Sequence, residues 1–294
     1  MSLPIINEAF LQRVERLQTL LKNNIAGLFG GNHQSKSFGS SCEFADYRNY
    51  IPGDDITKID WNAYARFETL YLKLYLDERQ LHTRIYIDVS RSMDYGKGKK
   101  GARAIELAAT LAYLSVCELD RVSVYTIRES EVTTLIDGMV GKDRFYNEIG
   151  KLNDIVFDGD CFISEGMLPT KVGYGDGLSI IISDFLTDND YERAIDYLAE
   201  KKRDLLCIQV LSEEEINPSA RGKNHFYDSE HPERYYRRNI NRDILNAYRE
   251  AVQFVQNRIR NYCNAREASF LLVSDEKPME QIFFEYLTQT GVLK

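Results

Sequence analysis

The stretch Ile85-Tyr86-Ile87-Asp88-Val89-Ser90-Arg91-Ser92-Met93 decides the fold of this chain, because an apolar run ends there in the pattern Asp-x-Ser-x-Ser. Residues two apart in an extended backbone point the same way, so Asp88, Ser90 and Ser92 present a carboxylate and two hydroxyls to one point at a strand end. Hard oxygen donors of this kind suit Mg²⁺, which keeps some of its waters when bound. The stretch therefore predicts a strand-end cation site that is open to an outside acidic group.

Apolar strands alternate with amphipathic helices along most of the chain. We expect strands over residues 84–89, 121–128, 131–136, 178–183, 205–211 and 269–273, and helices over residues 5–22, 100–118, 143–152, 191–202, 242–263 and 278–290. This alternation indicates an α/β fold, with a mostly parallel central sheet covered by helices on both faces. Ligands of such sheets bind beyond the carboxyl ends of the strands. Asp184 directly follows the strand at 178–183, so we expect it in the same site as Asp88.

A polar block precedes the alternating part of the chain. Residues 43–61 read EFADYRNYIPGDDITKIDW, in which Pro52-Gly53 predicts a tight turn. We expect two parts: residues 1–82, with an N-terminal helix and this block as a candidate strand-rich lobe, and residues 83–294, which form the α/β domain. The sequence leaves open whether the block packs on the sheet or stands apart from it.

These patterns resemble a known family. The Asp-x-Ser-x-Ser loop and the later strand ending in Ser183-Asp184 resemble the metal-ion-dependent adhesion site of von Willebrand factor A domains. The 43–61 block, continued by Ala65-Arg66 and Leu72-Lys73, is similar to the signature of bacterial domain-of-unknown-function 58 proteins over residues 33–290. The signature residues are Arg48, Tyr50, Pro52, Gly53, Asp54, Asp55, Asp60, Trp61 and Arg66.

The resemblance implies a von Willebrand factor A-like fold and a metal site. Asp88, Ser90, Ser92 and Asp184 are the implied ligands of Mg²⁺ or Mn²⁺. The adhesion site also uses a threonine, and Cys161 falls at that position here. A protonated thiol is a poor ligand for Mg²⁺, so Asp160 and Ser164 are the alternatives.

The resemblance also implies a function. Such proteins are associated with MoxR-type AAA+ ATPases in the assembly or activation of other proteins, so we expect a non-enzymatic interaction module whose partner is that ATPase or a client protein. One alternative is a metal-dependent hydrolase of phosphate esters, in which Asp88 and Asp184 hold the ion. Another is a metal-free scaffold. The Gly96-Lys97-Gly98-Lys99-Lys100-Gly101 stretch lacks the spacing of a phosphate-binding loop, and we interpret it as the entry to a helix.

Composition narrows the class of protein. The net charge of -8 disfavours a broad nucleic-acid surface. Five scattered cysteines without a Cys-x-x-Cys pair disfavour disulfides and a zinc site. Residues 5–22 carry charges throughout, and no apolar segment is long enough to span a bilayer. We therefore expect a cytoplasmic location, with peripheral membrane association only through a partner.

Overall fold

The computed structural model divides the chain into two units. The main unit comprises Met1–Ile25 and Leu81–Lys294, and the small unit comprises Ala26–Gln80. The structure describes residues 4–24, 44–75, 81–97, 99–170, 172, 177–186, 191–220, 222–227 and 235–289. The loop expected over residues 27–41 lies outside the described residues.

A six-stranded sheet in the order β10-β7-β6-β3-β4-β5 forms the centre of the main unit. Its strands are β3 (His82–Asp88), β4 (Arg121–Arg128), β5 (Glu131–Met139), β6 (Leu178–Ser183), β7 (Asp204–Leu211) and β10 (Ser269–Ser274). Strand β3 pairs in parallel with both β4 and β6, and only the edge strand β5 is antiparallel to its neighbour among these strands. The predicted α/β class with a mostly parallel sheet is confirmed.

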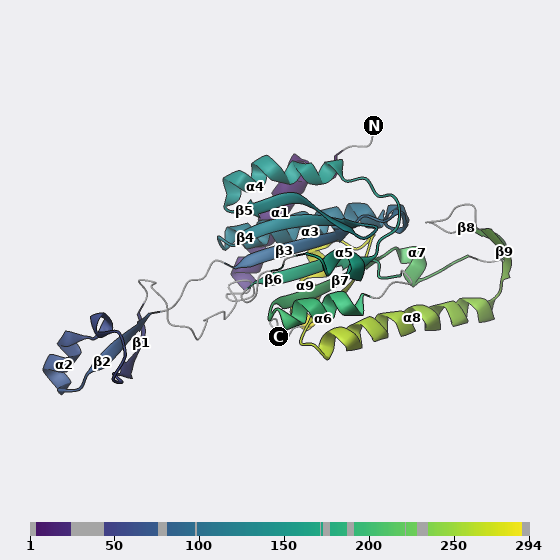
Figure 1. Cartoon of the computed structure of the whole chain (residues 1–294). Coiled ribbons are helices and arrows are strands. Elements are labelled where there is room, and N and C mark those ends of the chain that lie inside the picture. The colour runs from purple at the N-terminus through teal and green to yellow at the C-terminus, as the bar shows by residue number, and fades with distance from the viewer. Residues whose placement is uncertain are drawn as a thin grey trace. The chain divides into compact units, whose positions relative to one another are not determined.

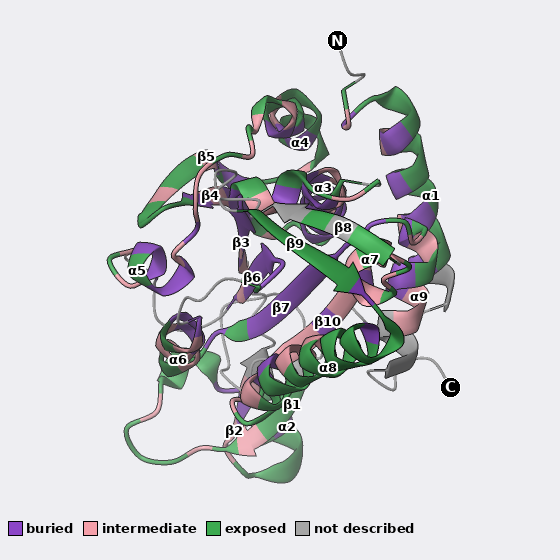
Figure 2. Ribbon diagram, turned by 90° about the vertical axis from the view of Figure 1, so that its right-hand side faces the viewer, coloured by how far each residue is buried: buried purple, intermediate pink, exposed green. Residues whose placement is uncertain are grey.

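Helices cover both faces of this sheet (Figures 1 and 2). One face carries α1 (Glu8–Asn24), α3 (Lys100–Cys117), α4 (Lys142–Glu148) and α9 (Met279–Gln289), and the other carries α5 (Ile163–Met167), α6 (Glu192–Glu200) and α8 (Arg242–Asn264). Helix α3 is buried at most of its positions because Ala, Leu and Ile surround its axis. The short 3-10 helices η2 (Arg91–Asp94) and η3 (Ile149–Asp154) follow β3 and α4. Among the described residues, no helix combines the length and apolar character needed to cross a membrane.

The small unit contains strands β1 (Phe44–Asn49) and β2 (Tyr71–Tyr75), which pair antiparallel, the 3-10 helix η1 (Ile56–Lys58) and helix α2 (Trp61–Phe67). The expected boundary after residue 82 lies two residues from the observed one, but the N-terminal helix was placed in the wrong part, because α1 belongs to the main unit. The apolar residues Phe10, Val14 and Leu17 of α1 are buried. Arg13 also pairs with Glu106 of α3 at 3.2 Å.

One element of the main unit was not predicted. Strands β8 (Gly222–Tyr227) and β9 (Tyr235–Ile240) form a two-stranded hairpin next to the four-residue helix α7 (Glu213–Ile216) (Figure 1). Half-buried strands alternate between apolar and polar residues, and this hairpin does not. In agreement, residues Tyr235 to Asn239 are all exposed.

Candidate functional site

The predicted donors meet at the carboxyl edge of the sheet. Asp88 is the last residue of β3, Ser90 is the N-cap residue of η2, Ser92 lies within η2, and Asp184 follows β6. The Ser92 hydroxyl donates to Asp184 Oδ2 at 2.8 Å, and Ser90 Oγ lies 3.1 Å from Ser92 Oγ. Because β3 and β6 are parallel neighbours, their carboxyl ends bring the two aspartates to one place.

The carboxylate of Asp88 is fully buried and is held by the chain itself. Its Oδ1 accepts from the backbone N–H of Ser90 at 2.9 Å, and its Oδ2 accepts from the hydroxyl of Ser183 at 2.6 Å. Burial raises the pKa of Asp88, and the neighbouring charge of Asp184 adds to this rise. Both oxygens of Asp88 therefore face donors that the protein supplies.

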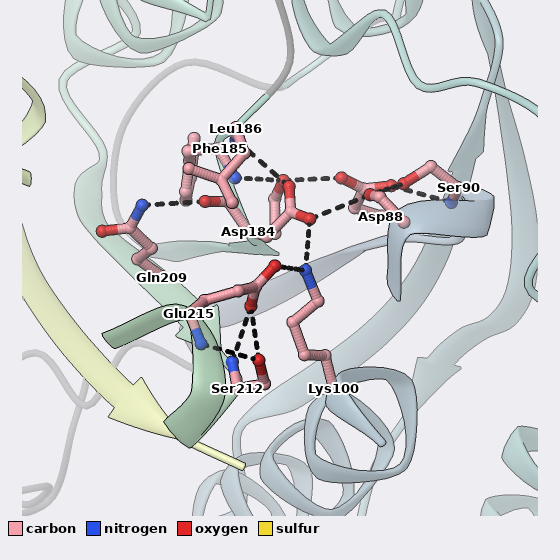
Figure 3. A network of polar contacts seen from close by, with 11 residues as sticks. Asp88, Ser90, Lys100, Asp184, Phe185, Leu186, Gln209, Ser212 and Glu215 are labelled. Carbon is pink, nitrogen blue, oxygen red and sulfur yellow. Dashed lines mark hydrogen bonds and ion pairs between the residues drawn. The ribbon is translucent and has the colours of Figure 1, made fainter. Parts of the chain in front are cut away.

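Lys100, which the sequence predicts as part of a helix entry, completes this network (Figure 3). Lys100 is the first residue of α3, and only 1% of its side chain is exposed. Its Nζ donates to Asp184 Oδ2 at 2.8 Å and to Glu215 Oε1 at 2.9 Å. Burial alone would lower the pKa of Lys100, but the carboxylates of Asp184 and Glu215 raise it above its ordinary value. Lys100 is therefore an ammonium ion at neutral pH.

Glu215 is held in place by helix α7. The Ser212 hydroxyl accepts from the Glu215 N–H, while Glu215 Oε2 accepts from the Ser212 N–H at 2.7 Å, which makes a capping box. The other side of the network is fixed too, since Gln209 Nε2 donates to the backbone carbonyl of Asp184 at 2.8 Å. The Leu186 N–H donates to Asp184 Oδ1 at 3.1 Å. The polar groups around Lys100 are thus pre-arranged by backbone and side-chain contacts.

The remaining predicted ligands make contacts of their own within the main unit. Cys161 is fully buried in an apolar cluster that includes Ile127 and Ile163. The backbone carbonyl of Asp160 accepts from the Glu129 N–H at 2.8 Å, and the Ser164 hydroxyl accepts from the Ala194 N–H at 3.1 Å. Cys161 and Ser164 thus belong to the packing around α5.

The donor set does not fit the Mg²⁺ or Mn²⁺ that the sequence predicts. In the part of the chain that the structure describes, no cluster of three or more His, Cys, Asp or Glu residues has the arrangement of a metal site. Asp184 shares one oxygen between the Ser92 hydroxyl and the Lys100 ammonium, and Asp88 is satisfied by Ser90 and Ser183. Binding of Mg²⁺ or Mn²⁺ is thus a prediction from the sequence that these contacts do not support.

The signature residues of the small unit stabilise its local structure. Asp60 caps α2, accepting from the N–H groups of Asn62 at 2.9 Å and Ala63 at 3.2 Å. It also accepts from the Tyr47 hydroxyl at 2.7 Å and lies 3.3 Å from the ammonium of Lys73. The Tyr47 hydrogen bond is the largest of the effects that lower the pKa of Asp60 to about 2.

The turn before α2 is braced in a similar way. Asp54 pairs with Arg48 at 2.8 Å and accepts from the Ile51 N–H, while Asp55 caps η1 through Thr57. The backbone at Gly53 has φ of 108°, which favours glycine. The Tyr50 N–H donates to the Leu70 carbonyl, and Pro52 lies in the turn. The Trp61 ring meets the Tyr64 ring edge-on. Arg66 lines a pocket together with Asp60. These contacts give most of the signature residues a structural role in the small unit.

Solved structures with some likeness to this chain include BatB of Bacteroides thetaiotaomicron, with 15% identity and a TM-score of 0.40 over 72% of this chain and 98% of that chain. Another is the SpRpn10 VWA domain, with 9% identity and a TM-score of 0.39 over 73% of this chain and 97% of that chain. These likenesses concern the fold alone.

The expected cytoplasmic location is withdrawn, because an absence of membrane-spanning helices does not establish it. A further similar structure, with 12% identity and a TM-score of 0.38 over 71% of this chain and 97% of that chain, is described as an aerotolerance-related membrane protein from Bacteroides fragilis. The predicted location rests on the lack of an apolar span in the sequence. Such a lack does not show where a protein acts. We no longer assign the chain to the cytoplasm.

Among sequence relatives, an uncharacterised protein of Mycobacterium tuberculosis is 24% identical over 207 residues, or 68% of this chain. The chain spans 64% of the length of this relative. The family described as protein of unknown function DUF58 matches residues 46–262, which include the signature block and the carboxyl-edge network. The chain therefore belongs to the DUF58 family, as its signature predicts.

Proposed function

We propose that this chain is a non-enzymatic protein-interaction module that binds its partner at the carboxyl edge of the main sheet. We further propose that the partner is a MoxR-type AAA+ ATPase or a client protein of such an ATPase. The observation that carries the proposal is the exposed hairpin β8–β9 at this edge (Figure 1).

The hairpin exposes side chains that proteins use for binding. Tyr235 and Tyr236 are 57% and 62% exposed, and Arg237 and Arg238 follow them in the same exposed strand. Tyrosine and arginine are enriched among the residues that dominate the binding energy of protein interfaces. A two-stranded hairpin alone is at best marginally stable in water, so an exposed one gains from a partner. Ile240, which is buried, anchors the hairpin where α8 begins.

Further apolar side chains surround the same edge. Exposed large apolar residues in segments that follow the carboxyl ends of the strands are Tyr95, Leu186, Ile244 and Tyr248. The ring of Tyr95 lies 5.9 Å from the Lys100 ammonium. The partial burial of Tyr248 raises its pKa, and the charge of Glu215 adds to the rise, so α8 also faces the Lys100 network. Aromatic residues are enriched at protein interfaces, so their exposure around this edge supports a docking surface here.

The polar centre does not favour the hydrolase alternative. Each oxygen of Asp88 and Asp184 accepts at least one hydrogen bond from the chain, and both residues are fully buried. Carboxylates held in this way are poorly placed to activate water or to act as a general base. They are suited to fixing the loops that present the surrounding side chains.

The proposal is tested by binding measurements between the purified chain and a MoxR-type AAA+ ATPase from the same organism. We expect the double variant Tyr235→Ala/Tyr236→Ala to lose at least tenfold in affinity, since these side chains present the exposed aromatic surface. The matched control is Leu119→Ala, which removes a side chain of 67% exposure next to the amino end of β4. Equal binding by the two variants would exclude the carboxyl edge as the contact.

The same assay with EDTA tests whether the interaction needs Mg²⁺ or Mn²⁺. Peripheral association with a membrane through the partner forms part of the same proposal. It predicts that the chain sediments with membrane vesicles only when a membrane-bound partner is present.

A further inference from the structure

Lys100 holds a positive charge at the place for which the sequence predicts a metal ion. We propose that the ammonium of Lys100 is the built-in cation of the carboxyl-edge site, that this makes the site independent of divalent metal, and that removing the ammonium converts the site into one that binds Mg²⁺. This inference concerns the cation of the site and does not depend on the identity of the partner.

The first support is the position of the ammonium. Asp184 Oδ2 accepts from the Ser92 hydroxyl and from Lys100 Nζ, each at 2.8 Å. One oxygen thus joins the serine loop to the cation (Figure 3). A divalent ion placed on this oxygen would meet the ammonium as a like charge in a buried setting, where such repulsion is weakly screened. The two cations therefore exclude each other.

The second support is that the chain keeps the ammonium there despite two opposing effects. Lys100 is buried, and it begins an 18-residue helix, whose amino end disfavours positive charge. The carboxylates of Asp184 and Glu215 offset both effects, and the capping box with Ser212 fixes Glu215 for this contact. A surface lysine would need none of these groups.

The third support is the close packing on both sides of the lysine. A Cβ added to Gly101 would lie 2.5 Å from the Phe157 ring, and one added to Gly96 would lie 2.5 Å from Asp275 Oδ2. Only glycine fits at these two positions without movement of the neighbours. The glycine- and lysine-rich stretch thus brings the start of α3 close against its neighbours, and with it the Lys100 ammonium.

The test compares the full-length chain with Lys100→Ala in Mg²⁺ and in EDTA, by thermal unfolding and by calorimetric titration with MgCl₂. For the natural chain we expect the same melting temperature in both conditions and no saturable heat. For Lys100→Ala we expect a lower melting temperature in EDTA, a rise of roughly 5 °C at Mg²⁺ well above its Kd, and a saturable heat near one ion per chain. The double variant Asp88→Ala/Lys100→Ala should lose the Mg²⁺ response.

The matched control is Lys97→Ala, which removes an exposed ammonium from the same stretch, paired with Glu214 at 3.3 Å. It should behave as the natural chain does. Saturable Mg²⁺ binding by the natural chain that Asp88→Ala abolishes would overturn the proposal, and so would a folded Lys100→Ala without a Mg²⁺ response. If Lys100→Ala does not fold in either condition, Lys100→Ala/Glu215→Gln, which removes one of the two stranded carboxylates, is used with the same criteria.

Discussion

Replacing Lys100 with methionine tests how much the buried ammonium contributes to stability. Methionine keeps the length and apolar stem of the side chain but removes two charged hydrogen bonds, at 2.8 Å to Asp184 and 2.9 Å to Glu215. Hydrogen bonds to charged groups contribute about 1.5–3 kcal/mol each. The lower desolvation cost of methionine offsets part of the sum, whereas the buried Asp184 is left without its cation. We therefore expect the free energy of unfolding to fall by about 3–5 kcal/mol, as for other buried pairs that lose one member.

The assay is urea unfolding at neutral pH, followed by far-UV circular dichroism. Lys97→Met is the control, because its pair with Glu214 is exposed, and its unfolding free energy should equal that of the natural chain within error. A double-mutant cycle with Glu215→Gln isolates the Lys100–Glu215 coupling, since glutamine retains an acceptor for the capping box. A loss below about 1 kcal/mol in Lys100→Met would refute the view that the ammonium is held by strong ionic contacts.

Two further predictions concern packing and pH. Gly101→Ala should lower the free energy of unfolding by about 1–3 kcal/mol, because its Cβ would press on the Phe157 ring. Gly150→Ala, where a Cβ meets nothing within 4 Å, should not lower it, and equal urea midpoints for the two variants would contradict the prediction. The pKa of Asp60 is lowered from 3.8 to about 2, so its stabilising effect is present above pH 3.8 and is lost as the pH falls towards 2. The fluorescence of Trp61, the single tryptophan, should report this acid transition, and it should lose this dependence on pH in Asp60→Asn.

The centre of the sheet could be predicted from the sequence because β3, β6 and β7 are buried on both faces over most of their length. The expected strand at 178–183 coincides with β6. The expected strand at 205–211 starts one residue later than β7 does and ends at the same residue. Uninterrupted runs of Ile, Leu and Val give a strong signal when both faces of a strand are covered. The same apolar runs predict that Asp88 and Asp184 lie close together, because neighbouring parallel strands end at the same edge of a sheet.

Lys100 could not be predicted as part of the site from local sequence. Its partner Glu215 lies 115 residues away in a four-residue helix, and lysine is almost always solvent-exposed in folded proteins. One signal was present, namely a lysine in the first turn of a nearly all-apolar helix, where a positive charge is unfavourable without a nearby acid. The hairpin β8–β9 gives no such signal, since Tyr235 to Asn239, which make up most of β9, are exposed.

Helix α1 remains packed in the main unit although residues 26–80 separate it from β3. Besides the Arg13–Glu106 pair, the Ile6 N–H donates to Asn153 Oδ1 at 2.8 Å, and the Asn153 amide donates back to the Ile6 carbonyl. The small unit is thus an insertion with two covalent tethers to one body. A single proteolytic nick anywhere within it would leave both fragments attached to that body, so the cleaved chain would elute at its original size under native conditions and separate into two pieces only in denaturant.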